Sequence, residues 1–305
     1  MQRTSYFQSS VFSPRKMAFR KQDWAVLLLY RLGYPRVRLL LNSLKKTPSV
    51  RIVAFHDIPP GCEEGFAAKM KFLKTEANVI SLADYLQSKL SARRLNVVLT
   101  FDDGYKSWIR TAAPVLRELQ LPAVFFVSSG FVGLSQADEQ TFVQSNLRLS
   151  GKTTGSMSKQ DLQFLGNSGF DIGGHTRNHV NLGSVRTPTE AMREIADDKN
   201  QLEAIVGKEV KYFAYPFGAC RNPSVDLENV LSRAGFRASV TTEGGQNGPG
   251  QPRHFLKREL THAALPTVVF AARAFGTYDG VKTVRGLPVL RSLLQRDASD
   301  AVAAN

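Results

Sequence analysis

The chain has 305 residues, 43% of them hydrophobic and 22% charged, and this ordinary globular composition excludes intrinsic disorder, a collagen repeat and a coiled coil. Its two cysteines are too few for a disulfide scaffold or a four-cysteine zinc site. Of the net charge of +14, residues 1–50 carry +9 and residues 281–305 carry +2, so the chain between them is nearly neutral and no nucleic acid is expected as a partner.

The basic N-terminal segment is the first predicted element. Its most apolar run, residues 24–30, is seven residues long, whereas a membrane-spanning helix needs about 18 consecutive apolar residues. No small-residue cleavage site of a signal peptide follows this run, which favours a location in the cytoplasm or at the inner membrane. Residues 1–48 are therefore expected to form a basic, largely helical extension. Residues 15–46 would either lie on an anionic membrane surface or pack on the next domain with their basic face in solvent.

From residue 50 onward, short β-rich runs alternate with helical stretches. Predicted strands cover residues 50–56, 96–101, 122–127, 169–174, 210–215, 236–241 and 255–260, with a shorter one near residues 79–80. Predicted helices cover residues 65–75, 82–90, 106–119, 158–167, 188–206, 224–234 and 266–275. Several strands are continuously apolar, which is typical of parallel strands covered by helices. The alternation predicts an α/β fold, a distorted (β/α) barrel of seven or eight strands over residues 49–276, followed by a tail over 277–305; an open doubly wound sheet is the alternative.

Two segments of this barrel have signals of their own. The helix over 188–206 has strong ones, because Thr187 can cap its start, Pro188 suits its first turn and Gly207 can end it. Residues 129–157 are rich in Gly, Ser, Thr and Gln, and they are expected to form a long loop of the kind that carries function or is disordered.

Polar residues cluster directly after two of the predicted strands. Asp102 and Asp103 follow an apolar run, and two adjacent carboxylates are costly to bury unless a cation holds them; an ordinary Asp-Gly turn in water is the alternative. His175 and His179 are spaced to lie on one side of a helical turn, where their imidazoles can converge on one cation, unless they are simply solvated loop residues. The two glycines before them would allow the backbone to approach a ligand closely. Two histidines and one aspartate would form a metal site with positions left open for water and substrate.

A third cluster spans residues 213–218, with the sequence Phe-Ala-Tyr-Pro-Phe-Gly. Here Tyr215, Pro216 and Phe217 would form a rigid hydrophobic wall with backbone N–H groups at its tip. A packed structural turn is the alternative.

In this order and spacing, the clusters resemble the motifs of the polysaccharide deacetylase family, the family-four carbohydrate esterases, and the resemblance covers roughly residues 50–262. The Thr-Phe-Asp-Asp-Gly run matches the first motif of the family, and His-Thr-x-x-His matches the second. The resemblance implies that Asp103, His175 and His179 hold one divalent metal ion, with zinc favoured and cobalt or nickel as alternatives. It also implies that Asp102 is the general base on the metal-bound water.

Further roles follow from the same resemblance. A backbone N–H of Phe217 would stabilise the oxyanion, and Arg258 would hydrogen-bond the base. His56, on the strand before the first motif, is favoured as the general acid, an arrangement similar to a circularly permuted branch of the family; a hydrogen-bonded core histidine is the alternative. His262 fits the Leu-x-His pattern of the commoner branch and is the second candidate. The chain departs from the usual third motif, because Ala214 stands where the family commonly has an arginine.

The resemblance therefore implies a metal-dependent hydrolase that removes N-acetyl groups from amino sugars of a polysaccharide or oligosaccharide. A non-sugar amide or imide hydrolase on the same fold and a non-catalytic glycan-binding domain are the alternatives. All three implied metal ligands and the implied base are present in the chain, which counts against both.

Overall fold

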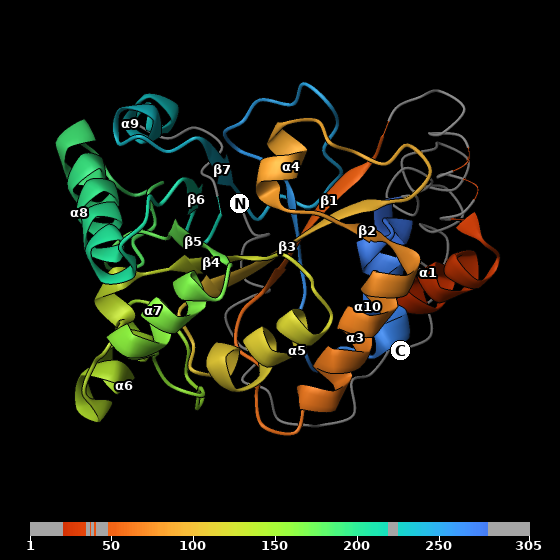
Figure 1. Cartoon of the computed structure of the whole chain (residues 1–305), viewed down its shortest axis with the longest axis horizontal. Helices are drawn as coiled ribbons and strands as arrows, with labels where there is room; N and C mark the ends of the chain where they lie inside the picture. The colour runs from red at the N-terminus through yellow and green to blue at the C-terminus, as the bar shows by residue number, and fades with distance from the viewer. Residues whose placement is uncertain (1–20, 35–36, 38–39, 41–47, 219–224, 280–305) are drawn as a thin grey trace, which may run out of the picture.

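The centre of the molecule is a parallel β-sheet, which is seen in a computed structural model that describes residues 21–34, 37, 40, 48–218 and 225–279 (Figure 1). Seven strands follow one another in the order β7-β6-β5-β4-β3-β1-β8, and the short β2 pairs with the start of β3. The strands are β1 (Val50–Phe55), β2 (Asn78–Val79), β3 (Asn96–Asp103), β4 (Val124–Val127), β5 (Asp171–Gly174), β6 (Tyr212–Ala214), β7 (Ala238–Val240) and β8 (Arg258–Leu260). Each predicted strand is present, with ends that differ by a few residues.

The sheet nearly closes where β7 meets the residues that lead into β8. Leu256 forms a parallel bridge with Val240. The Leu256 N–H donates to the Ser239 carbonyl at 2.9 Å, and the Thr241 N–H donates to the Leu256 carbonyl at 2.8 Å. Hydrogen bonds therefore join the two edges of the sheet, and the prediction of a distorted (β/α) barrel is confirmed.

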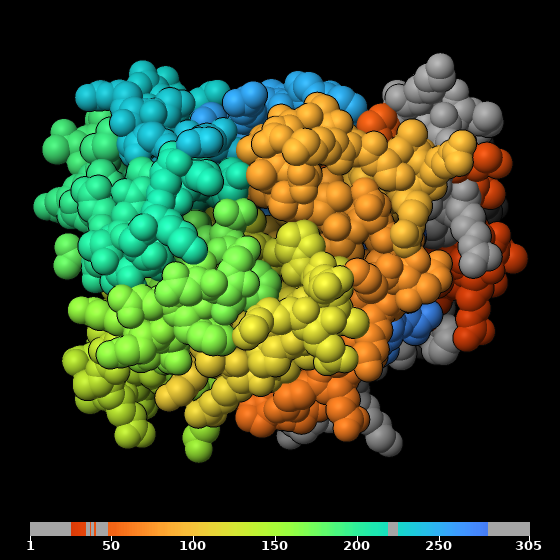
Figure 2. All heavy atoms as spheres, viewed as in Figure 1, coloured from red at the N-terminus to blue at the C-terminus, as the bar shows by residue number. Residues whose placement is uncertain are grey.

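Helices cover the outside of this barrel, as the space-filling view shows for one side of the molecule (Figure 2). They are α1 (Lys21–Arg31), α3 (Glu63–Glu76), α4 (Leu82–Leu86), α5 (Ala113–Glu118), α6 (Gln136–Ser145), α7 (Lys159–Asn167), α8 (Pro188–Val206), α9 (Leu227–Arg233) and α10 (Thr267–Ala274). A π-helical turn, η1 (Trp108–Ala112), precedes α5, and a 3₁₀ turn, η2 (Ser129–Phe131), follows β4. The expected start and stop of α8 are confirmed, because the Thr187 side chain accepts from the Glu190 N–H and Gly207 has a left-handed backbone.

The prediction of one long loop over residues 129–157 is wrong, because α6 lies within it. The Ser135 side chain accepts a hydrogen bond from the Asp138 N–H and caps the helix. This local capping pattern favours a helix start in spite of the polar composition.

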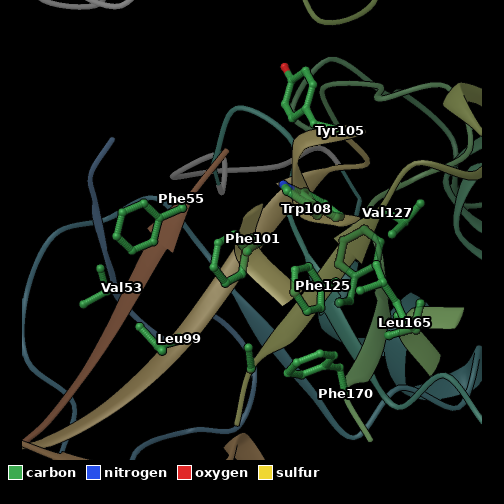
Figure 3. Close-up of a cluster of buried hydrophobic side chains, with 14 of the residues drawn as sticks. Val53, Phe55, Leu99, Phe101, Tyr105, Trp108, Phe125, Val127, Leu165 and Phe170 are labelled. Carbon is green, nitrogen blue, oxygen red and sulfur yellow. The ribbon is translucent and has the colours of Figure 1, made fainter. Parts of the chain in front are cut away.

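Two buried layers of side chains hold the strands in place, since successive side chains of a strand point to opposite faces. On the outer face, the ring of Phe101 stacks on Phe125 at 4.8 Å and on Phe55 at 5.6 Å between ring centroids, beneath the helices (Figure 3). The inner layer consists of Val50, Ile52, Val98, Val124, Phe126, Tyr212, Ala214, Ala238, Val240 and Leu256, with Ile80, Leu82 and Tyr85 beside them. Close packing on both faces fixes the ends of neighbouring strands relative to one another.

The described part of the N-terminal extension packs on the barrel domain. Helix α1 contacts α10, and its Val26 is buried, while Leu28 and Leu32 are exposed (Figure 1). No helix among the described residues is long and apolar enough to cross a membrane. The remainder of the predicted extension and most of the predicted tail over 277–305 lie outside the described residues.

Candidate metal centre and active site

Two carboxylates at the end of β3 point in different directions. Asp102 continues the inner row of side chains that begins with Val98 and Thr100, as the alternation of a strand requires. Asp103 has a φ of 93°, a conformation that residues with a side chain rarely adopt, and Gly104 follows at 124°. The backbone therefore turns sharply at Asp103 and places its carboxylate beside the two histidines that follow β5.

The side chains of Asp103, His175 and His179 form one buried cluster. The Nε2 atoms of His175 and His179 lie 3.4 Å and 3.2 Å from Oδ1 of Asp103. One ligand atom from each of the three residues lies within 4.8 Å of the others. The structure thus brings together the three residues that the sequence indicated as metal ligands.

The hydrogen bonds of the two imidazoles show which of their nitrogens face the cluster. Nδ1 of His175 lies 2.7 Å from the Ala214 carbonyl, and Nδ1 of His179 lies 3.1 Å from the Asn146 carbonyl. A carbonyl can only accept, so each Nδ1 carries a proton and, in a neutral imidazole, each Nε2 presents a lone pair. Burial lowers the pKa of His175, which favours the neutral ring.

The third member of the cluster is ionised. Burial raises the pKa of Asp103, but the imidazoles that face it outweigh burial, so its pKa lies well below the usual value. Among the described residues, no hydrogen-bond donor reaches Oδ1 of this carboxylate. When both imidazoles are neutral, three lone-pair atoms of the kinds that bind divalent ions converge at this point, so these residues fit a metal ion.

Two carboxylates of α8 hold the histidine-bearing turn from outside. Asp198 accepts hydrogen bonds from the backbone N–H groups of Ser129 and His175, both at 2.8 Å, and so joins the ends of β4 and β5. Glu194, one helical turn away, accepts from the N–H of Asn178 at 3.0 Å and from its Nδ2 at 2.8 Å. Asp198 is fully buried, and burial raises its pKa to about 7.

Sequence reasoning missed Asp198, although the sequence contains a signal for it. It occupies the same buried row of α8 as Ala191, Ile195 and Leu202, where an apolar residue is the rule. A carboxylate in such a row has to accept hydrogen bonds from something nearby.

Two expectations about the histidine-bearing segment are wrong in detail. Residues 175–179 form a turn without helix, in which Thr176 and His179 have φ values of 57° and 52°, so the imidazoles converge through an unusual backbone rather than through helical periodicity. Gly173 does not leave room for a ligand. A Cβ atom there would lie 2.3 Å from the ring of Phe126, so the glycine accommodates a core side chain.

Asp102 makes a buried ion pair inside the barrel. Arg258 of β8 donates from Nη1 to Oδ1 at 2.6 Å and from Nη2 to Oδ2 at 2.7 Å. The same guanidinium donates from Nε to the Thr241 carbonyl and from Nη1 to the Thr100 hydroxyl. Burial raises the pKa of Asp102, but Arg258 first, and then His175 and His56, together outweigh it, so the net shift is downward and the carboxylate is ionised.

His56 directly follows β1, the strand next to β3. Phe55 pairs with Phe101, so His56 follows at the level of Asp102. It is near enough to both carboxylates for its charge to lower their pKa values against the effect of burial. Its backbone carbonyl accepts from Nε1 of Trp108 at 3.0 Å.

His262 has different surroundings. It follows β8, and burial, together with the positive charges of Arg273 and Lys69, lowers its pKa to about 4. An imidazole with such a pKa is neutral at pH 7, so it is not in the charged form that acts as a general acid.

Asp57 fixes the residue before it and was also missed. Its carboxylate accepts from the Ser107 hydroxyl at 2.7 Å, from the Thr154 hydroxyl at 2.6 Å and from the Thr154 N–H at 2.9 Å. These bonds tie the end of β1 to the segment after β3 and to the end of the 129–157 segment. No motif identifies this residue from the sequence, because its partners lie far away in the chain.

The third cluster contributes one side chain to the site. Phe217 has a φ of 58° and its ring lies edge-to-face on His179, with 4.6 Å between centroids. Tyr215 points elsewhere, because its ring stacks on Phe255 at 5.1 Å and its hydroxyl accepts from Ser239. Pro216, which lies between these two residues in the sequence, is buried. The predicted roles of these three residues in substrate binding stay predictions.

Fold and site together define a β/α-barrel protein with a candidate metal centre at the carboxyl ends of its strands, the end at which barrel enzymes carry their functional groups. A sequence profile for polysaccharide deacetylases matches residues 90–239, a segment that contains Asp102, Asp103, both histidines and Phe217. Over this segment, about half of its length, the chain is similar to the polysaccharide deacetylase family.

Individual relatives agree with this assignment. The chain is 21% identical over 251 residues to a poly-beta-1,6-N-acetyl-D-glucosamine N-deacetylase of Staphylococcus aureus, which covers 81% of this chain and 82% of the relative. The fold of this chain is similar to that of the Streptococcus pyogenes deacetylase PplD in complex with acetate, with a TM-score of 0.59 and 18% identity, and the match covers 75% of this chain and 99% of that one. It is also similar to the structure of IcaB from Ammonifex degensii (TM-score 0.56, 24% identity, 74% and 98%).

Proposed function

We propose that the protein is a metal-dependent hydrolase that removes N-acetyl groups from amino sugars of a polysaccharide or oligosaccharide. The observation that carries the proposal is the convergence of three lone-pair atoms, from Asp103, His175 and His179, next to the ionised carboxylate of Asp102. The named activity of the Staphylococcus aureus relative supports poly-β-1,6-N-acetylglucosamine as the first substrate to try.

Asp103, His175 and His179 would hold the divalent ion, with zinc favoured and cobalt or nickel as alternatives, since a site with two imidazoles and one carboxylate suits several ions. When bound, such an ion lowers the pKa of a water molecule and polarises a carbonyl oxygen. The Nδ1 hydrogen bonds of the two histidines keep their Nε2 lone pairs directed toward the cluster.

Asp102 is proposed as the general base that takes a proton from the attacking water. Arg258 occupies one lone pair of each carboxylate oxygen, so a second lone pair stays available for a proton. The backbone N–H of Phe217 is proposed to donate to the oxyanion that forms on the acetyl carbonyl.

His56 is proposed as the general acid that protonates the departing amine. Its position level with Asp102, and the unfavourable surroundings of His262, support this choice. The acid would then come from the first barrel strand, as in the circularly permuted branch of the family. Comparison of His56→Ala with His262→Ala tests the assignment: loss of rate only in His262→Ala would contradict it.

The test of the function is acetate release combined with metal analysis of the purified protein. Oligomers of β-1,6-linked and β-1,4-linked N-acetylglucosamine and peptidoglycan fragments are the substrates to compare. We expect about one ion per chain and acetate release that a chelator abolishes and added zinc restores. Metal binding without acetate release from any of the three would reject the deacetylase and favour a glycan-binding domain. Release only from non-sugar amides would favour the amide hydrolase.

We also propose that the N-terminal extension holds the enzyme at an anionic membrane surface. Leu28 and Leu32 of the α1 region are 59% and 70% exposed, and Val37 and Leu40 are exposed as well, within a segment of strongly positive charge. The packing of α1 on α10 supports the alternative of a structural extension. Co-sedimentation with vesicles of anionic lipid would distinguish them. We expect binding that is lost in a truncation lacking residues 1–47 and weakened in Leu28→Ser, whereas equal sedimentation of all three proteins would contradict the membrane role.

A further inference from the structure

The segment that follows α6 lies against the candidate metal centre. Asn146 accepts from Nδ1 of His179 through its carbonyl at 3.1 Å, and its Nδ2 donates to the Asn178 carbonyl at 2.8 Å. Two residues further along, Arg148 has a φ of 58°, so the chain turns unusually here too. The Asn146 contacts therefore anchor a chain segment that carries Arg148 close to the site.

Arg148 covers an aromatic ring that lies beside the candidate metal centre. Its guanidinium carbon lies 4.6 Å from the centroid of the Phe217 ring, and the same ring contacts His179. Phe217 is 41% exposed, and Arg148 is exposed as well. The Arg148 side chain thus lies at the solvent-exposed edge of the site, where the ring of Phe217 separates it from His179, a proposed metal ligand.

The N–H groups of this guanidinium are available. Within the described part of the chain, no residue accepts a hydrogen bond from Arg148 or forms an ion pair with it. Stacking on an aromatic ring restrains a guanidinium while it leaves the donors in its plane free for oxygen acceptors. A preorganised donor of this kind loses little side-chain entropy when it binds a ligand.

We propose that Arg148 is a substrate-binding residue, which donates hydrogen bonds to oxygen atoms of the glycan beside the sugar that loses its acetyl group. This inference rests on the proposed function and adds a specificity determinant from the 129–157 segment. Hydroxyl and carboxylate oxygens share the required acceptor chemistry, so neutral oligomers and carboxylate-bearing peptidoglycan fragments are separate arms of the test.

The chain offers a matched control on its outer surface. Arg117 of α5 lies 5.8 Å from the ring of Phe164 of α7, and that ring is 46% exposed. This pair has the same chemistry as Arg148 and Phe217, but it lies on the outer helices away from the strand ends. Arg117→Ala therefore removes an exposed arginine–phenylalanine contact without touching the site.

The experiment measures kcat, KM and metal content for the wild type, Arg148→Ala, Arg148→Lys and Arg117→Ala. For Arg148→Ala we expect KM to rise about tenfold, because one charge-assisted hydrogen bond to the substrate is lost. The kcat should stay within about twofold of the wild type, and the metal content should not change. Arg148→Lys should recover part of the loss, and Arg117→Ala should match the wild type. A larger effect on carboxylate-bearing fragments than on neutral oligomers would identify an acidic acceptor, and an equal effect would identify hydroxyls.

Equal KM values for Arg148→Ala and Arg117→Ala would overturn the proposal, as would a loss of metal from Arg148→Ala. Direct binding of the oligomers by calorimetry separates this failure from failure of the deacetylase function. If the wild type binds oligomers but releases no acetate, the binding constant of Arg148→Ala still decides the role of Arg148. If no oligomer binds to the wild type, both proposals fall.

Discussion

The two aspartates at the end of β3 are neighbours in the chain, but they lie in two contrasting halves of the site. The half around Asp102 is closed, because Arg258 supplies a donor to each carboxylate oxygen and fills its own donors with Thr100 and Thr241. The half around Asp103 is open, because Oδ1 of Asp103, which faces Nε2 of both histidines, receives no hydrogen bond from the described residues.

The comparison shows which half needs something that the chain does not provide. The closed half is a buried ion pair with matched partners, and such pairs keep their geometry without a ligand. The open half combines unusual backbone at Asp103, Thr176, His179 and Phe217 with unmatched lone pairs. Backbone strain of this kind concentrates where function requires it. A cation should therefore bind at one half and leave the other unchanged.

The largest effect is expected from Asp103→Ala, which removes the anionic member of the three proposed metal ligands. We expect metal content to fall to background and acetate release to become undetectable, while the barrel stays folded by circular dichroism. Metal analysis by mass spectrometry provides the measurement. Full metal content in this variant would show that the ion binds elsewhere.

The next largest effect is expected from Asp102→Asn, which changes the closed half alone. The amide cannot take a proton from water, so we expect kcat to fall by about 10³-fold, within the usual contribution of general base catalysis. Metal content should equal that of the wild type, because Asp102 belongs to the half that does not bind the ion. Loss of metal from Asp102→Asn would contradict the division between the two halves.

Much of this arrangement could be predicted from the sequence because its signals are local. Continuous apolar runs alternating with helical stretches indicated the barrel, and the positions directly after strands indicated Asp102, Asp103, His175 and His179. In parallel strands these positions all lie at one end of the sheet, so proximity followed from topology.

Residues whose role depends on distant partners could not be predicted in the same way. Asp198 meets Ser129 and His175 across 69 and 23 positions of the chain, and Asp57 meets Thr154 across 97. The left-handed backbone of Thr176 was also missed, because tertiary contacts rather than local preference determine it. Arg258 was indicated only by resemblance, and the structure supplies the ion pair that gives it a physical role.

A smaller and more specific effect is expected from Arg258→Met, which opens the closed half. Arg258 holds the pKa of Asp102 down against burial, so its removal should raise that pKa. The acid limb of the pH profile of kcat/KM should then move to higher pH, by about one to three units. Arg258→Lys should restore part of the shift, since it returns the charge without the two-pronged geometry. An acid limb that does not move would show that Asp102 does not control it.

The smallest effect is expected from Asp198→Asn, which loosens the open half from outside. The carboxylate accepts from two backbone N–H groups, and an amide would turn an NH₂ group toward one of them. His175 would then be held less firmly, and the affinity for the metal should fall by about tenfold, as for other outer partners of metal ligands. Titration of the apoprotein with zinc or cobalt measures this affinity without relying on activity.

The neighbouring Asp197→Asn is the matched control for this last prediction. Asp197 also lies on α8, and its carboxylate comes within 3.7 Å of Arg177, which is in the turn that carries the two histidines. Both side chains are about half exposed. Exposed ion pairs of this kind contribute little, so metal affinity should stay within about twofold of the wild type. The cobalt absorption spectrum adds a second measurement, because a displaced His175 would change the ligand geometry. Equal affinities and spectra for the two variants would show that α8 supports the fold without positioning the ligand, and the open half would then owe its geometry to the strand ends alone.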